Sequence, residues 1–331
     1  LKTVTDPLTG RDILLAGRIG EIDIVENQVR CTLVYTQSLD TEQKSSLNFA
    51  CMQAIADKFP GVQTHVHLET QMQAGAPPRS ILPQVRNIVA VASGKGGVGK
   101  STVSTNLALG LKAQGFKVGL MDADLYGPSI PTMLGLYGQR PRLQEVYGKP
   151  KIIPLEAHGI PVISIGFIVD PEQAVVLRGP RLAGIIKQFI EECIWPDLDY
   201  LVIDLPPGTG DIQLTLVQTV PLTGVVLVTT PQQVAVADAI KAMNMFRMTS
   251  VNVPVLGVVE NMAWFTPAEL PENRYYLFGQ GGGARLAKEG ETNLLGQIPV
   301  VQGIMEGGEK GKPAVLDEQA EEVRKAWLDL A

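Results

Sequence analysis

The sequence predicts an α/β protein, in which an open, mostly parallel sheet carries helices on both faces and a small α+β domain precedes it. Short runs rich in Val and Ile alternate with helical stretches through the larger, C-terminal part of the chain. These runs lack the polar–apolar alternation of half-exposed strands, which favours strands buried on both faces. A Pro- and Gly-rich segment separates them from an N-terminal part whose strands do alternate.

The domain organisation follows from these composition shifts. The chain has 331 residues, which is enough for two domains and a sizeable core. We predict a small α+β domain at 1–73, a Pro/Gly linker at 74–86 and the larger α/β domain at 87–331. In such a sheet, ligands bind beyond the carboxyl ends of the strands, where the charged and Gly-rich motifs of this chain fall.

The small domain offers no catalytic constellation. Its segment SSLNFACMQAIADKF has helical periodicity and predicts one apolar stripe made of Leu47, Cys51, Ile55 and Phe59. His65 and His67 lie two apart on a predicted strand and therefore point to one face. They form a metal pair or a solvated strand face, and a solvated face is the commoner outcome for such a pattern.

Composition narrows the function classes. Hydrophobic residues make up 45% and charged residues 19% of the chain, and the net charge is −6. An acidic balance predicts no nucleic-acid binding, and no apolar run reaches the roughly 20 residues that span a bilayer. We find no export signal, and the three separated cysteines fit reduced thiols. The sequence therefore predicts a cytoplasmic protein without membrane or nucleic-acid partners.

The strongest motif is VASGKGGVGKST at 91–102. It matches the phosphate-loop pattern G-x-x-x-x-G-K-[ST] between a predicted strand and a predicted helix. Its glycines let backbone N–H groups approach phosphate oxygens, Lys100 bridges the β- and γ-phosphates, and Ser101 ligates Mg²⁺. The predicted nucleotide-binding residues of the loop are Gly94, Gly96, Gly97, Val98, Gly99, Lys100, Ser101 and Thr102.

Two strand ends supply the carboxylates that a magnesium nucleotide needs. Four apolar residues precede Asp204 in LVIDLPPGTGD, as expected of a carboxylate that holds the water shell of the metal. Asp122 and Asp124 end another predicted strand, in GLMDADLYGPS, and their spacing puts both on one side of an extended backbone. One of them can orient the attacking water.

Lys95, just after the first glycine of GKGGVGKST, makes this loop resemble the deviant phosphate loop of the MinD/ParA/nitrogenase-iron-protein ATPases. The resemblance implies that the early lysine crosses the interface of an ATP-dependent homodimer to reach the partner's nucleotide. The long stem and point charge of a lysine suit such a contact.

Further motifs resemble the Mrp/ApbC-type iron–sulfur cluster carriers. They are DADLYGPSIPTMLGL, RGPRLAGIIKQF, DYLVIDLPPGTGD, TTPQQVAVADAIKAMNMF, GVVENMAWF and LFGQGGGARLA. The resemblance covers nearly the whole chain and implies ATP hydrolysis, bound ATP or ADP with Mg²⁺, and an iron–sulfur apo-protein or scaffold as partner. It also implies that Asp124 polarises the hydrolytic water with support from Asp122, that Asn261 recognises the adenine edge, and that the segments around Pro231 and Pro299 flank the base.

The chain departs from that family after NM-x-x-F. There the carriers usually have a Cys-x-x-Cys pair, whereas this chain has Pro267 and Leu270, which cannot ligate iron. None of the cysteines Cys31, Cys51 and Cys193 forms such a pair, so the cysteines do not support a cluster site. The family therefore leaves an iron–sulfur cluster possible, without a ligand set in the sequence.

Two alternatives to a cluster carrier remain. One is a MinD/ParA-like switch and the other is a scaffold whose ATP site only locks a dimer. The C-terminal stretch VLDEQAEEVRKAWLDLA is amphipathic but acidic, and Val323, Trp327 and Leu330 predict a helix docked on the ATPase domain rather than a membrane anchor. A Rossmann dinucleotide enzyme is excluded because the loop ends in Gly-Lys-Ser.

Overall fold

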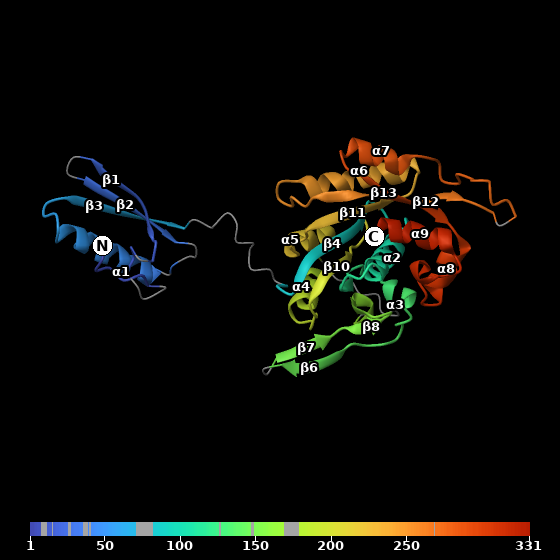
Figure 1. Ribbon diagram of the computed structural model, residues 1–331, viewed down its shortest axis with the longest axis horizontal. Helices are drawn as coiled ribbons and strands as arrows, with labels where there is room; N and C mark the ends of the chain where they lie inside the picture. Colours follow the sequence, from blue (N-terminus) through green and yellow to red (C-terminus); the bar gives the residue numbers. More distant parts are fainter. Residues whose placement is uncertain are drawn as a thin grey trace. The chain divides into compact units, whose positions relative to one another are not determined.

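A computed structural model of the chain divides into two compact units, Leu1–Arg79 and Ser80–Ala331 (Figure 1). The boundary between the units falls within the segment 74–86. The structure describes residues 1–7, 12–14, 16–25, 28–35, 39, 41–70, 82–125, 127–146, 149–168, 179–267 and 269–331.

The first unit is a three-stranded sheet covered by one helix. Strand β1 (Ile19–Val25) pairs antiparallel with β2 (Gln28–Tyr35), which pairs in parallel with β3 (Gln63–Thr70). Helix α1 (Thr41–Ala56) supplies the crossover between the two parallel strands and contacts β3. Two parallel neighbouring strands require such a crossover connection, which is usually a helix.

The predicted apolar stripe of α1 is correct for Leu47, Cys51 and Ile55, which are buried in the core of this unit. It is wrong for Phe59, whose side chain is 62% exposed. The helix ends at Ala56, so the helical periodicity that aligned Phe59 with the other three no longer applies at that position.

The two histidines of β3 lie on its solvent face. His65 and His67 are both exposed, opposite Arg30 and Thr32 of β2 in the strand register. Among the described residues, no three His, Cys, Asp or Glu side chains gather closely enough to hold a metal ion.

The second unit contains an eight-stranded sheet of order β13-β12-β11-β4-β10-β5-β9-β8, in which the β8–β9 pairing is antiparallel and the others are parallel. This confirms the predicted mostly parallel sheet. The central strands are buried along their length, which explains their continuous apolar sequence. Its strands are β4 (Val85–Ser93), β5 (Val118–Asp122), β8 (Leu155–Ala157), β9 (Ile160–Ser164), β10 (Leu198–Asp204), β11 (Gly224–Thr229), β12 (Val255–Phe265) and β13 (Leu294–Val300).

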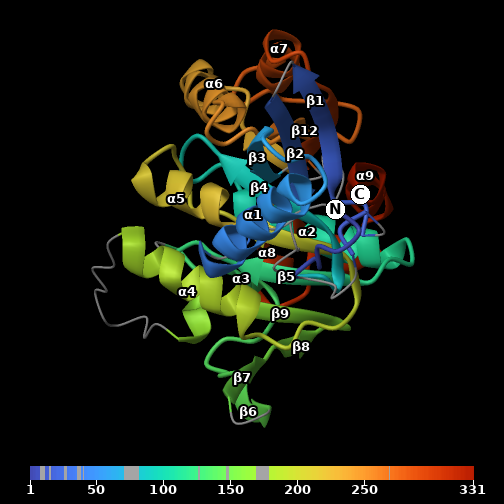
Figure 2. The same cartoon turned by 90° about the vertical axis from the view of Figure 1, so that its left-hand side faces the viewer.

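Helices cover both faces of this sheet. Figure 2 shows α4, α5 and α6 on one side of the sheet and α2 and α9 on the other. A two-stranded hairpin, β6 (Arg142–Val146) and β7 (Lys149–Ile153), is a separate sheet (Figure 1). The helices are α2 (Lys100–Ala113), α3 (Ile130–Met133), η1 (Ile165–Phe167), α4 (Gly179–Glu191), α5 (Asp211–Thr219), α6 (Gln233–Arg247), α7 (Gly282–Glu289), α8 (Gln302–Glu309), η2 (Ala314–Leu316) and α9 (Glu321–Leu330).

The second unit begins before residue 87, where the sequence placed its start. Leu82 and Val85 are buried in its core, and β4 starts at Val85. The end of the predicted linker therefore belongs to the packed domain, because burying these two apolar residues removes apolar surface from water.

The C-terminal helix docks as predicted. Trp327 and Leu330 of α9 are buried, and α9 packs against α2. The two helices approach closely at Gly110, where a Cβ atom would lie 3.2 Å from the Trp327 carbonyl oxygen of α9 and 2.8 Å from the Cβ atom of Ala331, which follows α9. Within the described part of the chain, none of the helices is long and apolar enough to cross a membrane.

Candidate functional site

The phosphate loop connects β4 to α2 at the carboxyl end of the central strands. Gly97 and Gly99 have left-handed φ values of 79° and 81°, and Gly99 is the N-cap residue of α2. A Cβ atom at Gly99 would lie 2.1 Å from the Asn261 side-chain nitrogen, and one at Gly94 would lie 2.2 Å from the Asp238 backbone. Backbone conformation and close packing therefore both require glycine in this loop.

Lys100 lies at the centre of a buried acidic cluster. Its Nζ atom is 2.8 Å from Asp204 Oδ2 and 3.3 Å from Asp124 Oδ2, and its side chain is 6% exposed. Burial alone would lower the pKa of Lys100, but the charges of these two carboxylates outweigh burial and raise it. The lysine is therefore a fixed cation at the start of α2, where the helix end also favours an anion.

Asp204, at the end of β10, accepts hydrogen bonds from two hydroxyls of α2. Ser101 Oγ donates to Oδ2 at 2.5 Å, and Ser104 Oγ donates to Oδ1 at 2.6 Å. Ser101 and Asp204 were predicted to meet, and the structure brings them together. Ser104 was missed, although its position three residues after Ser101 places it on the same helix face.

Asp122 and Asp124 differ in what they contact. Asp122 is fully buried, accepts the Asp124 backbone N–H at Oδ1 and accepts the Ser164 hydroxyl at Oδ2. Burial, and then the negative charge of Asp204, raise the pKa of Asp122 to about 8. Asp124 instead lines the cavity over the phosphate loop. Of the two predicted carboxylates, Asp124 is the one on the wall of this cavity.

A cavity of about 340 Å³ lies over the phosphate loop, and Lys95 is on its wall with Lys100 and Pro207. The Lys95 side chain is half-buried. Within the described ranges its ammonium makes no ion pair, and its backbone carbonyl accepts the Ser93 hydroxyl at 2.9 Å. The loop backbone is thus fixed while the charged end of Lys95 remains available.

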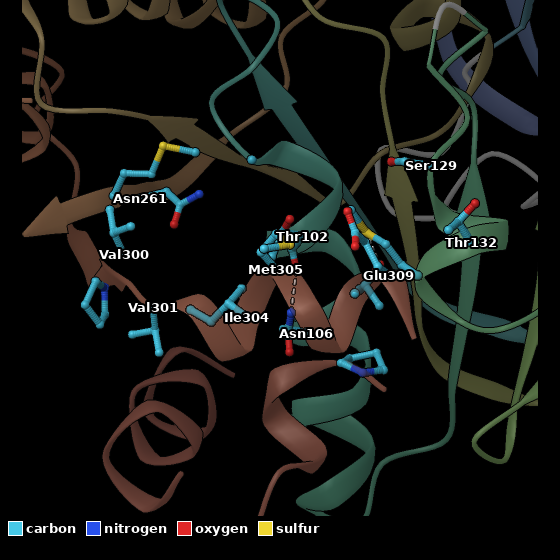
Figure 3. A pocket seen from close by; sticks show the side chains of 17 residues that line it. Thr102, Asn106, Ser129, Thr132, Asn261, Val300, Val301, Ile304, Met305 and Glu309 are labelled. Atoms are coloured by element: carbon cyan, nitrogen blue, oxygen red, sulfur yellow. Dashed lines mark hydrogen bonds between the residues drawn. The ribbon is translucent and has the colours of Figure 1, made fainter. Parts of the chain in front are cut away.

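A second, mostly apolar cavity of about 480 Å³ adjoins the first and shares Gly99, Thr102, Ser129 and Met133 with it. Figure 3 shows Asn261, Val300 and Val301 at one end, and Ser129, Thr132 and Glu309 at the other. The remaining residues on its wall are Thr105, Asn106, Met262, Pro299, Ile304, Met305, Gly308 and Pro313. Its size and lining suit a flat organic ring and a sugar next to the phosphate loop.

Asn261 has a structural contact that the sequence did not reveal. Its Nδ2 atom donates to the Val98 backbone carbonyl at 2.9 Å, which ties β12 to the phosphate loop. Pro299 lines the apolar cavity, whereas Pro231 is absent from its described wall and packs against the start of α7 at Gly282. Of the two prolines expected beside a base, Pro299 is the one near the cavity.

The three cysteines are all buried. Cys31, Cys51 and Cys193 are free thiols that are 1%, 0% and 5% exposed. Burial raises the pKa of all three thiols, that of Cys51 to about 11 and that of Cys193 to about 12. Because the thiolate is the form that binds metal, these thiols are poor ligands in the folded chain.

The burial of the thiols makes a direct prediction. In the folded protein at pH 8, fewer than about one thiol in twenty should react with a thiol reagent within minutes, because reaction requires an exposed thiolate. All three should react in denaturant. The measurement is thiol titration with and without denaturant, and prompt reaction of one thiol per native chain would contradict the buried placement.

The second unit has a mostly parallel sheet with helices on both faces, and a glycine-rich loop joins strand β4 to helix α2 at the carboxyl ends of the central strands. These features define a P-loop NTPase fold. A model of NUBPL iron-transfer P-loop NTPases (ParA) matches residues 84–331. The iron–sulfur cluster carrier protein of Synechocystis sp. is 44% identical to this chain over 334 residues, which cover 100% of this chain and 94% of that protein. The chain belongs to this iron–sulfur cluster carrier family, as its motifs indicated.

Solved structures agree with the fold. A nucleotide-binding protein in complex with ADP from Archaeoglobus fulgidus is 37% identical, with a TM-score of 0.62 over 72% of this chain and 90% of that chain. The septum site-determining protein MinD, complexed with Mg-ADP, from Pyrococcus horikoshii is 23% identical, with a TM-score of 0.55 over 74% of this chain and 94% of that chain. The MinD likeness shows the fold alone.

Proposed function

We propose that this chain binds ATP with Mg²⁺ at the strand-end site and hydrolyses it to ADP and phosphate. The observation that carries the proposal is the junction of Lys100, Asp204 and Ser101 at the phosphate loop, with Asp124 facing the same cavity. A triphosphate requires a cation, a metal ligand and a carboxylate that orients water, and the three motifs supply one each. The adjoining apolar cavity gives the base and ribose a place.

The donor set fits Mg²⁺. The Ser101 hydroxyl and the Asp204 carboxylate are hard oxygen ligands, and Asp204 is held by two hydroxyls and a lysine. When bound, the ion supplies positive charge that stabilises the phosphate oxygens in the transition state. On this proposal Asp204 holds the metal through water, and the Asp124 carboxylate orients the attacking water.

We propose further that the working unit is an ATP-dependent homodimer in which Lys95 contacts the partner's nucleotide. The support is that Lys95 lines the cavity and that its ammonium makes no ion pair among the described side chains. If Lys95 contacted the nucleotide of its own chain, it would repeat the role of Lys100. If it contacts the nucleotide of the partner across an interface, ATP hydrolysis depends on dimer formation. The long, single-charge side chain suits that reach.

The family and the buried cysteines together bear on the proposed role in iron–sulfur cluster transfer. Family membership supports a role in iron–sulfur cluster transfer, with an apo-protein or scaffold as partner. This chain has Pro267 and Leu270 where the family usually has ligating cysteines, and its own cysteines are buried. We therefore propose that this chain supplies the ATP-driven step while a partner holds the cluster. Iron and acid-labile sulfide, measured after anaerobic reconstitution with and without Mg-ATP, test this part of the proposal.

Asp204→Asn tests the metal role in the proposed reaction. The amide keeps the side-chain shape but loses the charge and one acceptor, so ATP hydrolysis should fall by about 100-fold. The measurement is phosphate release against Mg²⁺ concentration. Asp199→Asn, at the amino end of β10 and bonded to Arg86, is the matched control and should retain the parent rate. Equal rates in Asp204→Asn and the parent would contradict the proposal.

A further inference from the structure

Ser164 lies outside every motif that the sequence singled out, yet it contacts the acidic cluster. It is the last residue of β9, fully buried, and stands opposite Asp122 of β5 in the strand register. The two positions are 42 residues apart in the sequence, which hides this pairing. A serine at the end of a buried strand has a hydroxyl that must find partners there.

The Ser164 hydroxyl connects two backbone segments through one carboxylate. Its Oγ atom donates to Asp122 Oδ2 at 2.8 Å and accepts the Gly166 N–H at 2.9 Å. Asp122 Oδ1 accepts the Asp124 N–H at 3.0 Å. Both oxygens of Asp122 are therefore engaged inside the protein, and its side chain has no exposed surface with which to meet a nucleotide.

The same hydroxyl is linked through Gly166 to the wall of the two cavities. Gly166, in η1, packs against Pro128, just before α3, and Pro131, in α3: a Cβ atom at Gly166 would lie 2.9 Å from Pro128 and 3.2 Å from Pro131. Ser129, between these prolines, lines both cavities. Ser164 thus bonds directly to Asp122, whose other oxygen accepts the Asp124 N–H, and to Gly166, which packs against the prolines on either side of Ser129.

We infer that Ser164 is a positioning residue for the proposed hydrolysis, which acts through Asp122 to fix the backbone at Asp124. This inference rests on the proposed function for its effect on rate. Asp124 is then aimed by a buried relay, from Gly166 through Ser164 and Asp122, rather than by its own contacts alone. Preorganisation of this kind lowers the barrier because the carboxylate need not be oriented during the reaction.

Ser164→Ala tests the relay through two measurements. The variant should lower kcat for ATP hydrolysis by about tenfold and leave the Kd for Mg-ATP within about twofold, since no ligand contact is lost. Hydrogen exchange at the Asp124 amide should become at least about tenfold faster. Ser164→Cys, which keeps a weak donor in a similar volume, should give intermediate values in both.

The control is Thr292→Val, which removes a hydroxyl bonded to the Val255 carbonyl at the amino end of β12. It should retain the parent kcat and exchange rate. A double variant supplies a further criterion: in an Asp122→Ala background, Ser164→Ala should add no further loss of kcat, because the serine acts through that carboxylate.

The outcomes separate this inference from the proposed function. A parent that does not hydrolyse ATP would refute the proposed function, and the exchange at Asp124 would still decide whether Ser164 holds that backbone. A parent that hydrolyses ATP while Ser164→Ala matches Thr292→Val in kcat and in exchange would overturn the inference. Additive losses in the double variant would overturn it as well.

Discussion

Replacing Lys100 with alanine is expected to abolish nucleotide binding under ordinary assay conditions. The change removes the cation that the structure places between the loop and the carboxylates Asp204 and Asp124. Loss of one partner of a buried charge pair costs about 3 kcal/mol or more, which corresponds to at least about 100-fold in Kd. Titration calorimetry with Mg-ATP measures this effect, and Lys241→Ala, an exposed lysine of α6, is the control.

The same variant should also lose stability, by about 3 kcal/mol, because buried carboxylates are left without their cation. The pH dependence has a definite sign. The pKa of Asp122 is raised to about 8 in the folded chain, and the charge of Lys100 works to lower it. Removing Lys100 raises that pKa further, so the stability deficit should grow as pH rises through about 8. Urea unfolding at pH 6 and pH 9 measures it, and tight nucleotide binding by a folded Lys100→Ala would contradict the assignment.

Lys95→Ala is expected to spare nucleotide binding and lose hydrolysis. On the proposed function, Lys95 reaches the partner's nucleotide and Lys100 holds the phosphates of its own chain's nucleotide, so the Kd for Mg-ATP should stay within about twofold of the parent value. A cation supplied across an interface stabilises charge that develops in the transition state, and its loss should lower kcat by about 1000-fold. Lys187→Ala, in an exposed helical pair with Glu191, should behave as the parent. Equal turnover by Lys95→Ala and the parent would contradict the proposal that Lys95 acts on the partner's nucleotide.

Local signals explain how much of this site the sequence could predict. The phosphate loop has a fixed spacing, and Asp204 and Asp122 each end a continuous apolar run, so their meeting at one edge follows from the parallel sheet. Trp327 was predicted to dock because Val323, Trp327 and Leu330 lie on one face at helical spacing, and Trp327 is buried in the structure.

Contacts between distant segments explain what the sequence could not predict. The bond of Ser164 to Asp122 depends on the register of β9 against β5, which no pattern in either strand encodes. The hydrogen bond from the Asn261 side chain to the Val98 backbone carbonyl likewise joins remote segments. The β6–β7 hairpin was missed because its strands are short and carry charged residues rather than an apolar run.

The proposal of a dimer with an active lysine from each side is tested most directly by mixing two inactive variants. Lys95→Ala and Asp124→Asn proteins, each inactive alone, are combined in equal amounts with Mg-ATP and assayed for phosphate release. If Lys95 acts in trans, half of the dimers are mixed and each has one intact site, so about a quarter of the parent rate should return. If the mixture stays as inactive as its components while the two chains are shown to associate, Lys95 does not serve the partner's nucleotide.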